Sequence, residues 1–381
     1  MRVNLCIDSN YLLYKNVFIL KKLRRIKEDL SDLLMNDFNK LSKSFTFDNI
    51  YFVSDSKQGN WRKLIYKEYK GKREKDESVD WDFVYKTFEE FKEKIAKKKN
   101  IKSLELVGLE ADDFIGHIVR ESNKKGYSNV ILSSDRDLNQ LVKYDLSKKY
   151  INIQWNYKFS DERIYLPENY QLVIEELSNS INENIFELDN SSDFVKYIDN
   201  LINRTKTKTV TAEEILFCKI LEGDDGDNIP SVIHLKEGKV DNEGRGIGKD
   251  GATTIYKLYK EIHPETINID SEEFVNNLSD VVIYHKKIKD VRAKDILKQN
   301  IIFNRGLIVL DPKYMPKVTY ENMKSFFEEV ENRVIEYETE DSEVKLEEDD
   351  FFNEKSKEII PEQFNMESDG KFFDPDAFWE I

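Results

Sequence analysis

The chain has 381 residues, 39% of them hydrophobic and 35% charged, and its formal net charge is −15. This length and apolar content suffice for one large hydrophobic core or two smaller ones, so the composition excludes a globally disordered chain. No run of about 18 apolar residues occurs and the first residues lack a signal-peptide pattern, so we expect a soluble cytoplasmic protein without a membrane segment. Cys6 and Cys218 lie in apolar stretches, which favours reduced core thiols over a disulfide or zinc site. Any metal ligands are therefore expected to be oxygens.

Strand-like and helix-like patterns alternate along the first part of the chain. Four short apolar runs have the length and composition of buried strands, and they lie at residues 3–7, 50–53, 104–107 and 129–133. Helical patterns separate them, for example over 11–26 and 113–126. This alternation predicts an α/β fold with a mainly parallel central sheet flanked by helices.

Acidic side chains follow each of the four expected strands. In chain order they are Asp8, Asp55, Glu110 with Asp112 and Asp113, and Asp135 with Asp137. The carboxyl ends of parallel strands form one edge of a sheet, and ligands of open α/β sheets bind at that edge. We therefore expect these acids to share one site, provided that the strands are neighbours.

Such a group of carboxylates calls for a physical reason. A single exposed Asp is usually solvated surface, and Asp pairs are often helix caps. Two carboxylates about 5 Å apart at an effective dielectric of about 20 repel by roughly 3 kcal/mol, so a whole cluster is unfavourable as scaffolding. Divalent cations remove most of that repulsion, and a ligand set made only of oxygens points to magnesium or manganese.

A basic segment lies between the second and third expected strands. Residues 57–75 contain eight Lys or Arg against two Glu, with Trp61, Tyr66 and Tyr69 interleaved. Such a surface suits phosphate backbones and unstacked bases. The candidate nucleic-acid-binding residues in it are Lys63, Tyr66, Lys67, Tyr69 and Arg73.

A second acidic cluster and a glycine-rich turn come later in the chain. Asp224, Asp225 and Asp227 precede a proline-marked turn, and a turn with Gly246, Gly248 and Lys249 then opens a helix. Exposed N–H groups at a helix start, with a lysine beside them, suit a phosphate. A dinucleotide site is excluded, because no strand leads directly into these glycines.

Six segments in this order resemble the flap endonuclease and 5′→3′ exonuclease family, particularly its bacteriophage members. They are "CIDSN", "VSDS…NWRKLIYKEYKGKR", "GLEADD", "SSDRDLNQL", "LEGDDGDNIP" and "GRGIGKDGA", and the resemblance covers about residues 1–312. The resemblance implies a metal-dependent nuclease with a PIN-like fold. Such a nuclease would cut phosphodiester bonds near 5′ ends, on DNA flaps, at nicks or on RNA primers annealed to DNA. RNase H-like activity is also expected. A protein of this kind encoded by a phage would work in the cytoplasm of the host bacterium, as a monomer.

The resemblance also implies roles for individual residues. Lys70 and Arg62 match basic active-site residues of a helical arch. Two Mg²⁺ ions, with Mn²⁺ as a substitute, are expected, and the carboxylates matching the family's metal ligands are Asp8, Asp55, Glu110, Asp112, Asp113, Asp135, Asp137, Asp224 and Asp227. Asp225 stands where many members carry a non-acidic residue and is left out. The region around Gly246 resembles a helix-three-turn-helix motif that grips duplex DNA, often with K⁺ on its carbonyls.

Three divisions of the chain follow from this interpretation. Residues 1–210 form an α/β nuclease core with a basic arch at 57–102, residues 211–335 a helical DNA-binding region with a glycine turn at 244–251, and residues 336–381 an acidic, disordered tail. The chain departs from the family pattern in an insertion at 231–245, which leaves K⁺ binding open. A longer segment at 157–210 is interpreted as a surface subdomain, and the basic stretch at 21–27 as a solvated face or a rim for DNA.

The tail leaves several functions open. From residue 338 onward the chain has 16 acidic and 4 basic residues, which is typical of a solubilising tail. Phe372, Phe373, Phe378 and Trp379 instead suit a docking peptide for a sliding clamp or a single-strand-binding protein, and a third possibility is that the tail covers the basic arch. For the whole chain, the alternatives to a nuclease of this family are a non-catalytic nucleic-acid-binding replication adaptor and a PIN-type ribonuclease.

Overall fold

The computed structural model describes residues 1–73, 75–98, 100–158, 161–183, 191–237 and 239–339. A central sheet has the strand order β3-β2-β1-β4-β6-β7-β8, with the short β5 paired to β6. All neighbouring pairs are parallel except β6 with β7 and β5 with β6. The strands are β1 (Val3–Asp8), β2 (Asn49–Val53), β3 (Ile101–Leu104), β4 (Ser128–Leu132), β5 (Tyr144–Asp145), β6 (Tyr150–Asn156), β7 (Arg163–Pro167) and β8 (Lys206–Val210).

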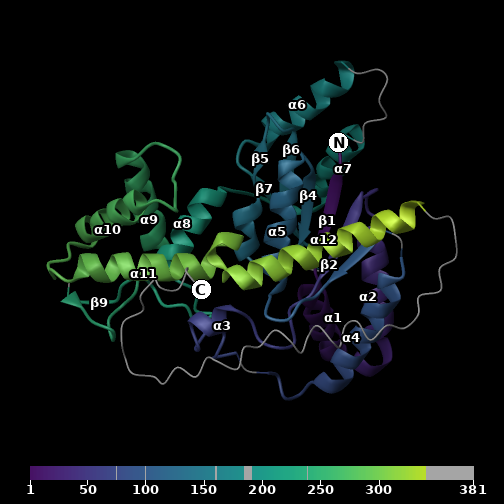
Figure 1. Cartoon of the computed structure of the whole chain (residues 1–381), viewed down its shortest axis with the longest axis horizontal. Helices are drawn as coiled ribbons and strands as arrows, with labels where there is room; N and C mark the ends of the chain where they lie inside the picture. Colours follow the sequence, from purple (N-terminus) through teal and green to yellow (C-terminus); the bar gives the residue numbers. More distant parts are fainter. Residues whose placement is uncertain (74, 99, 159–160, 184–190, 238, 340–381) are drawn as a thin grey trace.

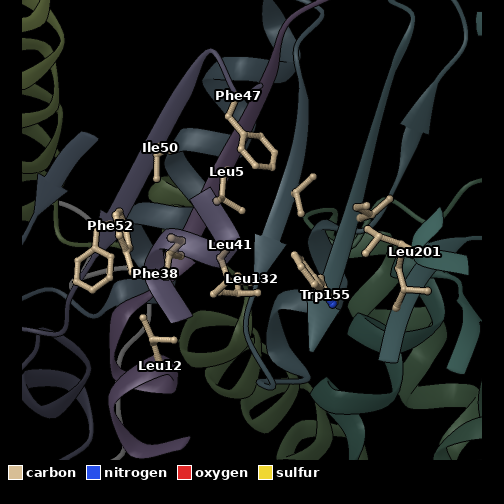
Figure 2. Packing of buried hydrophobic residues seen from close by; sticks show 14 of the residues in the cluster. Leu5, Leu12, Phe38, Leu41, Phe47, Ile50, Phe52, Leu132, Trp155 and Leu201 are labelled. Carbon is tan, nitrogen blue, oxygen red and sulfur yellow. The ribbon is translucent and has the colours of Figure 1, made fainter. Parts of the chain in front are cut away.

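Helices cover both faces of the sheet (Figure 1). Successive side chains of a strand point to opposite faces, so Leu5 and Ile7 of β1 join one apolar cluster and Cys6 joins the other. Figure 2 shows the first cluster, in which Phe38 and Trp155 pack with the strand side chains. The helices of this face are α1 (Ser9–Leu23), α2 (Ile26–Ser42), α4 (Trp81–Ala96), α6 (Tyr170–Glu183) and α7 (Ser191–Arg204).

The opposite face is covered by α5 (Ala111–Lys124) and by the C-terminal helix α12 (Lys317–Thr339). Met323 and Phe327 of α12 are buried against α5 and the strands. In Figure 1 this helix runs past α5, and it contacts β2 and β3. It thereby closes the second hydrophobic layer with a segment more than 200 residues away in the sequence from the strands that it covers.

A helical region lies beside the sheet and has a hydrophobic cluster of its own (Figure 1). Phe217, Ile255, Leu278 and Leu297 contribute to that cluster, one from each of its four helices. The helices are α8 (Ala212–Glu222), α9 (Lys249–Ile262), α10 (Glu272–Lys286) and α11 (Ala293–Ile308). A two-stranded hairpin of β9 (Leu235–Lys236) and β10 (Lys239–Val240) occupies part of the insertion that the sequence marked.

The predicted fold class is confirmed, with three differences in detail. The third strand is Ile101–Leu104 instead of 104–107, because the apolar residues that follow Leu104 belong to the loop that leads to α5. Residues 81–96 are not part of a projecting arch, since Phe88 and Phe91 are buried in the first cluster. The segment 157–210 is not a separate subdomain, since its strands extend the central sheet.

Two predictions about chain organisation stay open. The division at 210/211 remains a prediction, and the acidic tail with its aromatic residues lies outside the described residues, apart from the end of α12. None of the helices in the described part of the chain is long and apolar enough to span a bilayer.

Candidate metal centre and nucleic-acid interface

The ends of three neighbouring strands bring predicted acids to one edge of the sheet. Strand β1 lies between β2 and β4, in parallel, and ends at Asp8. Asp55 follows β2 by two residues and Asp135 follows β4 by three. Burial, together with the negative charges of Asp55 and Asp135, raises the pKa of Asp8 to about 7. The strands are therefore neighbours, as the prediction required, and their acids interact electrostatically.

A fourth acid, Asp112, joins this group from the first turn of α5. Burial raises its pKa well above the usual value, and repulsion from Asp135, Asp8 and Asp55 adds to the shift. Asp55 receives a hydrogen bond of 2.8 Å from the backbone N–H of Ala111, which ties the end of β2 to the start of α5. We call Asp8, Asp55, Asp112 and Asp135 the four-acid group.

Asp113 and Glu110 are held differently, because a buried arginine binds both. The Arg62 guanidinium donates to Asp113 at 2.9 Å and to Glu110 at 3.0 Å, and Trp61 donates its ring N–H to Asp113 at 3.1 Å. Asp113 also accepts from the backbone N–H of Glu110 at 3.0 Å and so caps α5. Arg62 is only 2% exposed. The structure thus gives Arg62 a different place from the predicted one: it holds two carboxylates in the interior and does not face a substrate.

Lys70 is a cation of the basic segment that contacts two of the predicted acids. Its ammonium group binds Glu110 and lies 3.9 Å from Asp227. Burial would lower the pKa of Lys70, but attraction by Glu110, Asp227 and Asp112 outweighs burial and raises it. The residue has a positive φ of 54°, and its backbone N–H donates to the carbonyl of Asp227 at 2.8 Å. These contacts fix the basic segment against the second acidic cluster.

Tyr69 contacts the same two acids, Glu110 and Asp227, from the interior of the protein. Its hydroxyl lies 2.9 Å from Glu110 and 2.8 Å from Asp227. The ring is 3% exposed, so Tyr69 does not offer the stacking face that the sequence suggested. Tyr66 is half-buried and packs edge-on against Phe303. The aromatic residues of the basic segment therefore mainly build the site.

The remaining acids meet a lysine that the sequence analysis missed. Lys219 of α8 binds Asp137 and also Asp224, the latter at 2.6 Å. It joins the helical region to the loop after β4. A signal was present in the sequence, because Lys219 is a lone charge within the apolar run "ILFCKIL".

The exposed cations of the predicted nucleic-acid surface are Lys63, Lys67, Arg73 and Lys249, and its two glycines, Gly246 and Gly248, are exposed as well. Arg73 pairs with Asp227 at 2.5 Å while more than half of its side chain stays exposed. Lys249 is the first residue of α9, and Gly248 is its N-cap, with no side-chain cap bond. Gly246 packs so closely that a Cβ there would lie 2.7 Å from the Cβ of Ser231, which explains the glycine.

The geometry of the acids suits a water-bridged ion better than a directly caged one. Within the residues that the structure describes, no three His, Cys, Asp or Glu side chains are arranged to hold one ion. Mg²⁺ usually keeps several water ligands and binds proteins through one or two carboxylates. The four-acid group is made only of carboxylates, which repel one another at one sheet edge, so its donor set fits a hard dication bound partly through water.

Comparisons with known proteins identify relatives of this arrangement. Residues 4–171 match the model of the 5′-3′ exonuclease N-terminal resolvase-like domain. The 5′-3′ exonuclease of Mycoplasmopsis pulmonis is 24% identical over 91% of this chain and 96% of its own length. The 5′-3′ exonuclease of Buchnera aphidicola (strain Sg) is 29% identical over 42% of this chain, which spans 54% of that relative. A thermostable DNA polymerase I of Thermus thermophilus is 29% identical over 36% of this chain, but only 16% of the polymerase is matched.

Solved structures share the fold over most of the chain. A flap endonuclease of bacteriophage T5, in a complex with DNA and metal ions, superposes with a TM-score of 0.53 at 14% identity, covering 87% of this chain and 99% of its own. The same phage protein crystallised with metal ions gives a TM-score of 0.52 at 15% identity, over 87% and 99% of the two chains. At sequence identities of 14% and 15%, this structural similarity establishes the fold alone.

Proposed function

Because this chain belongs to the 5′-3′ exonuclease family, we propose that it is a metal-dependent, structure-specific 5′-nuclease acting on DNA flaps, nicks or RNA primers annealed to DNA. The observation that carries the proposal is the four-acid group, in which acids from three strand ends and one helix start lie close enough to raise the pKa of Asp8 and Asp112 by mutual repulsion. Lys70 beside that group supplies the positive charge that a phosphodiester substrate needs there.

The four-acid group would hold the divalent ions, with Mg²⁺ as the proposed species and Mn²⁺ as its substitute. Bound there, such ions supply an activated water and offset the negative charge of the scissile phosphate. Asp137, Asp224 and Asp227 are proposed to act through bound water, since Lys219 and Arg73 already engage them directly. K⁺ binding near Gly246 is part of the same proposal. The close packing of the turn around Gly246 supports a role for the backbone of that turn.

The chain's own cations complete the site. Lys70 can release Glu110 and stabilise charge that develops on the phosphate oxygens in the transition state. The exposed Lys63, Lys67 and Arg73 lie on the same segment and can bind the neighbouring phosphates of the strand. Arg62 contributes indirectly, because it holds Glu110 and Asp113 in place.

The decisive experiment compares 5′-labelled flap, nicked and RNA–DNA hybrid substrates with magnesium and with a chelator. We expect cleavage only with magnesium, and we expect Asp135→Asn to reduce it by several orders of magnitude, because the substitution removes one charge from the four-acid group. Asp225→Asn is the matched control, since Asp225 is exposed and stands outside the predicted ligand set.

Binding of the ion itself gives an independent readout. Magnesium should raise the melting temperature of the intact chain and raise it less for Asp135→Asn. A chain that cleaves none of the three substrates with magnesium would support the replication-adaptor alternative instead. A single-stranded RNA is therefore tested as a fourth substrate, and cleavage of that RNA alone would favour the PIN-type ribonuclease.

A further inference from the structure

A group of partly exposed aromatic rings lies between α1 and α4, apart from the rings that build the site. Tyr14 and Phe18 of α1 stack with 6.4 Å between their ring centroids. Trp81 of α4 meets Tyr14 edge-on at 5.7 Å, and Tyr85 stacks on Trp81 at 5.7 Å. The hydroxyls of Tyr14 and Tyr85 are 3.3 Å apart. We call these four residues the α1–α4 ring group.

One face of α1 connects this ring group with the acids. The Asn10 side chain hydrogen-bonds Asp55, and Tyr14, Phe18 and Lys22 follow at steps of four residues. Residues at this spacing lie on the same face of a helix. With a rise of 1.5 Å per residue, the path from Asn10 to Lys22 is about 18 Å long, enough for a few nucleotides of single strand. Burial and the neighbouring Tyr85 raise the pKa of the Tyr14 hydroxyl, and the negative charge of Asp55 adds to that shift.

The outer end of the path is both apolar and cationic. Phe18 is 45% and Leu23 60% exposed. Lys22 and Arg24 are exposed beside them, and neither forms an ion pair within the described part of the chain. The ammonium of Lys75 lies 5.5 Å from the ring centroid of Tyr85. Cations without acidic partners next to an exposed ring are the combination that binds phosphates and stacks bases.

Neighbouring lysines show that the free cations are not a general property of this surface. Lys21, next to Lys22, binds Asp76, and Lys27 binds Asp80 at 2.8 Å. These two pairs join the ends of α1 and α2 that face their connecting turn to the residue after the basic segment and to the start of α4. They hold the surface together, while Lys22, Arg24 and Lys75 remain available to a ligand.

We infer that the α1–α4 ring group, with Lys22, Arg24 and Lys75, binds single-stranded nucleic acid: the 5′ arm that leads away from the cleaved phosphate. The inference rests on the proposed nuclease function only for the direction of the strand. Binding of a single strand to this surface is independent of cleavage. An apolar protein partner suits the surface less well, because it would leave these cations without counter-charges.

The test measures binding in chelator, where no cleavage occurs. Oligonucleotides with a duplex and a 5′ arm carry 2-aminopurine in the arm, and its fluorescence falls when the base stacks. We expect the intact chain to quench the probe and Phe18→Ala/Lys22→Ala to bind the arm about tenfold more weakly, with less quenching and a shallower dependence of affinity on salt. Leu172→Ala/Lys196→Ala is the matched control, because it removes another exposed apolar residue and another exposed lysine, on α6 and α7.

The outcomes separate this inference from the proposed function. Binding and quenching without cleavage in magnesium would sink the nuclease proposal and leave the single-strand site standing. Cleavage by the intact chain together with equal arm binding by the Phe18→Ala/Lys22→Ala variant would overturn the site. So would an equal loss of affinity for substrates with and without the arm, since the residues would then contact the duplex. Matching circular dichroism melts of both variants show that neither has lost the fold.

Discussion

The buried guanidinium of Arg62 sets the charge balance at the start of α5. It donates to Glu110, to Asp113 and to the carbonyl of Leu307, which lies 245 residues away in the chain. Burial alone would raise the pKa of Glu110, but Arg62 and Lys70 lower it overall, so this carboxylate stays charged in the interior. A basic residue in a basic segment gives no sign of such partners, and the family resemblance implied a basic active-site residue of the arch at this position.

Replacing Arg62 should strongly destabilise the protein. Arg62→Met leaves the buried Glu110 and Asp113 without their cation, and we expect the free energy of unfolding to fall by about 3–5 kcal/mol. Chemical denaturation of the metal-free protein measures this loss. Lys63→Met changes the exposed neighbour and should alter stability by no more than about 0.5 kcal/mol. Similar values for the two variants would contradict the structural role of Arg62.

Adjacent aspartates should respond in opposite directions to the same substitution. Asp112→Asn removes a carboxylate whose pKa burial and neighbouring acids raise, so in chelator we expect a higher melting temperature. Asp113→Asn replaces a carboxylate that binds Arg62, Trp61 and its own helix start, so we expect a lower one. Shifts of the same sign in both variants would show that the two acids do not have separate roles.

At the scale of elements, the contact of α5 with α12 ties the C-terminal helix to the sheet. His117 of α5 packs edge-on against Phe327, with ring centroids 5.0 Å apart, and also against Tyr320. Glu331 accepts from Tyr51 of β2 at 3.0 Å and from the buried Lys102 of β3 at 2.8 Å. The last contact also accounts for the misplaced third strand. "IKSL" carries a lysine that looks surface-exposed in the sequence but is buried by a helix from the far end of the chain.

This contact should make stability depend on pH. Burial, aided by the positive charges of Arg120, Lys124 and Lys324 and opposed by Glu121, lowers the pKa of His117 to about 4. The unfolded chain then binds a proton more readily than the folded one. The contribution of the neutral His117 side chain to the free energy of unfolding is fully present above about pH 6.5 and is lost as the pH falls toward 4.

Denaturation at pH 7 and pH 5 tests the effect. We expect the free energy of unfolding to fall by about 1–2 kcal/mol more in the wild type than in His117→Leu. His234→Gln serves as the control and should keep the wild-type dependence. If His117→Leu loses as much stability as the wild type, His117 is not the group responsible.

For the whole molecule, a row of asparagines runs across the central sheet. Asn49, Asn4, Asn129 and Asn152 are register partners on β2, β1, β4 and β6. Their side-chain amides form a chain, with bonds of 3.0 Å from Asn49 to Asn4, 3.2 Å from Asn4 to Asn129 and 2.9 Å from Asn129 to Asn152. Sequence periodicity identified three of these strands as apolar runs and placed acids after each. It could not reveal the row, because the amide bonds between the strands join residues that lie far apart in the sequence.

Removing the centre of the row should cost stability. Asn129→Ala leaves the amides of Asn4 and Asn152 short of a partner inside the sheet, and we expect unfolding to become easier by about 2–4 kcal/mol. Asn100→Ala, at an exposed turn, is the control and should change the value little. A loss no larger than that of the control would mean that the row contributes nothing measurable.

The asparagine row also fixes the register of the three strands that bring acids to the site. Asp8 stands four residues beyond Asn4, Asp55 six beyond Asn49, and Asp135 six beyond Asn129. A strand that slid along its neighbours would lose its amide partner at one end and misplace its carboxylate at the other. The positions of the acids at one end of the strands therefore depend on the pairing of the asparagines at the other end. A wrong strand register would break buried hydrogen bonds of the row, so the same bonds that stabilise the sheet keep the acids of the site in place.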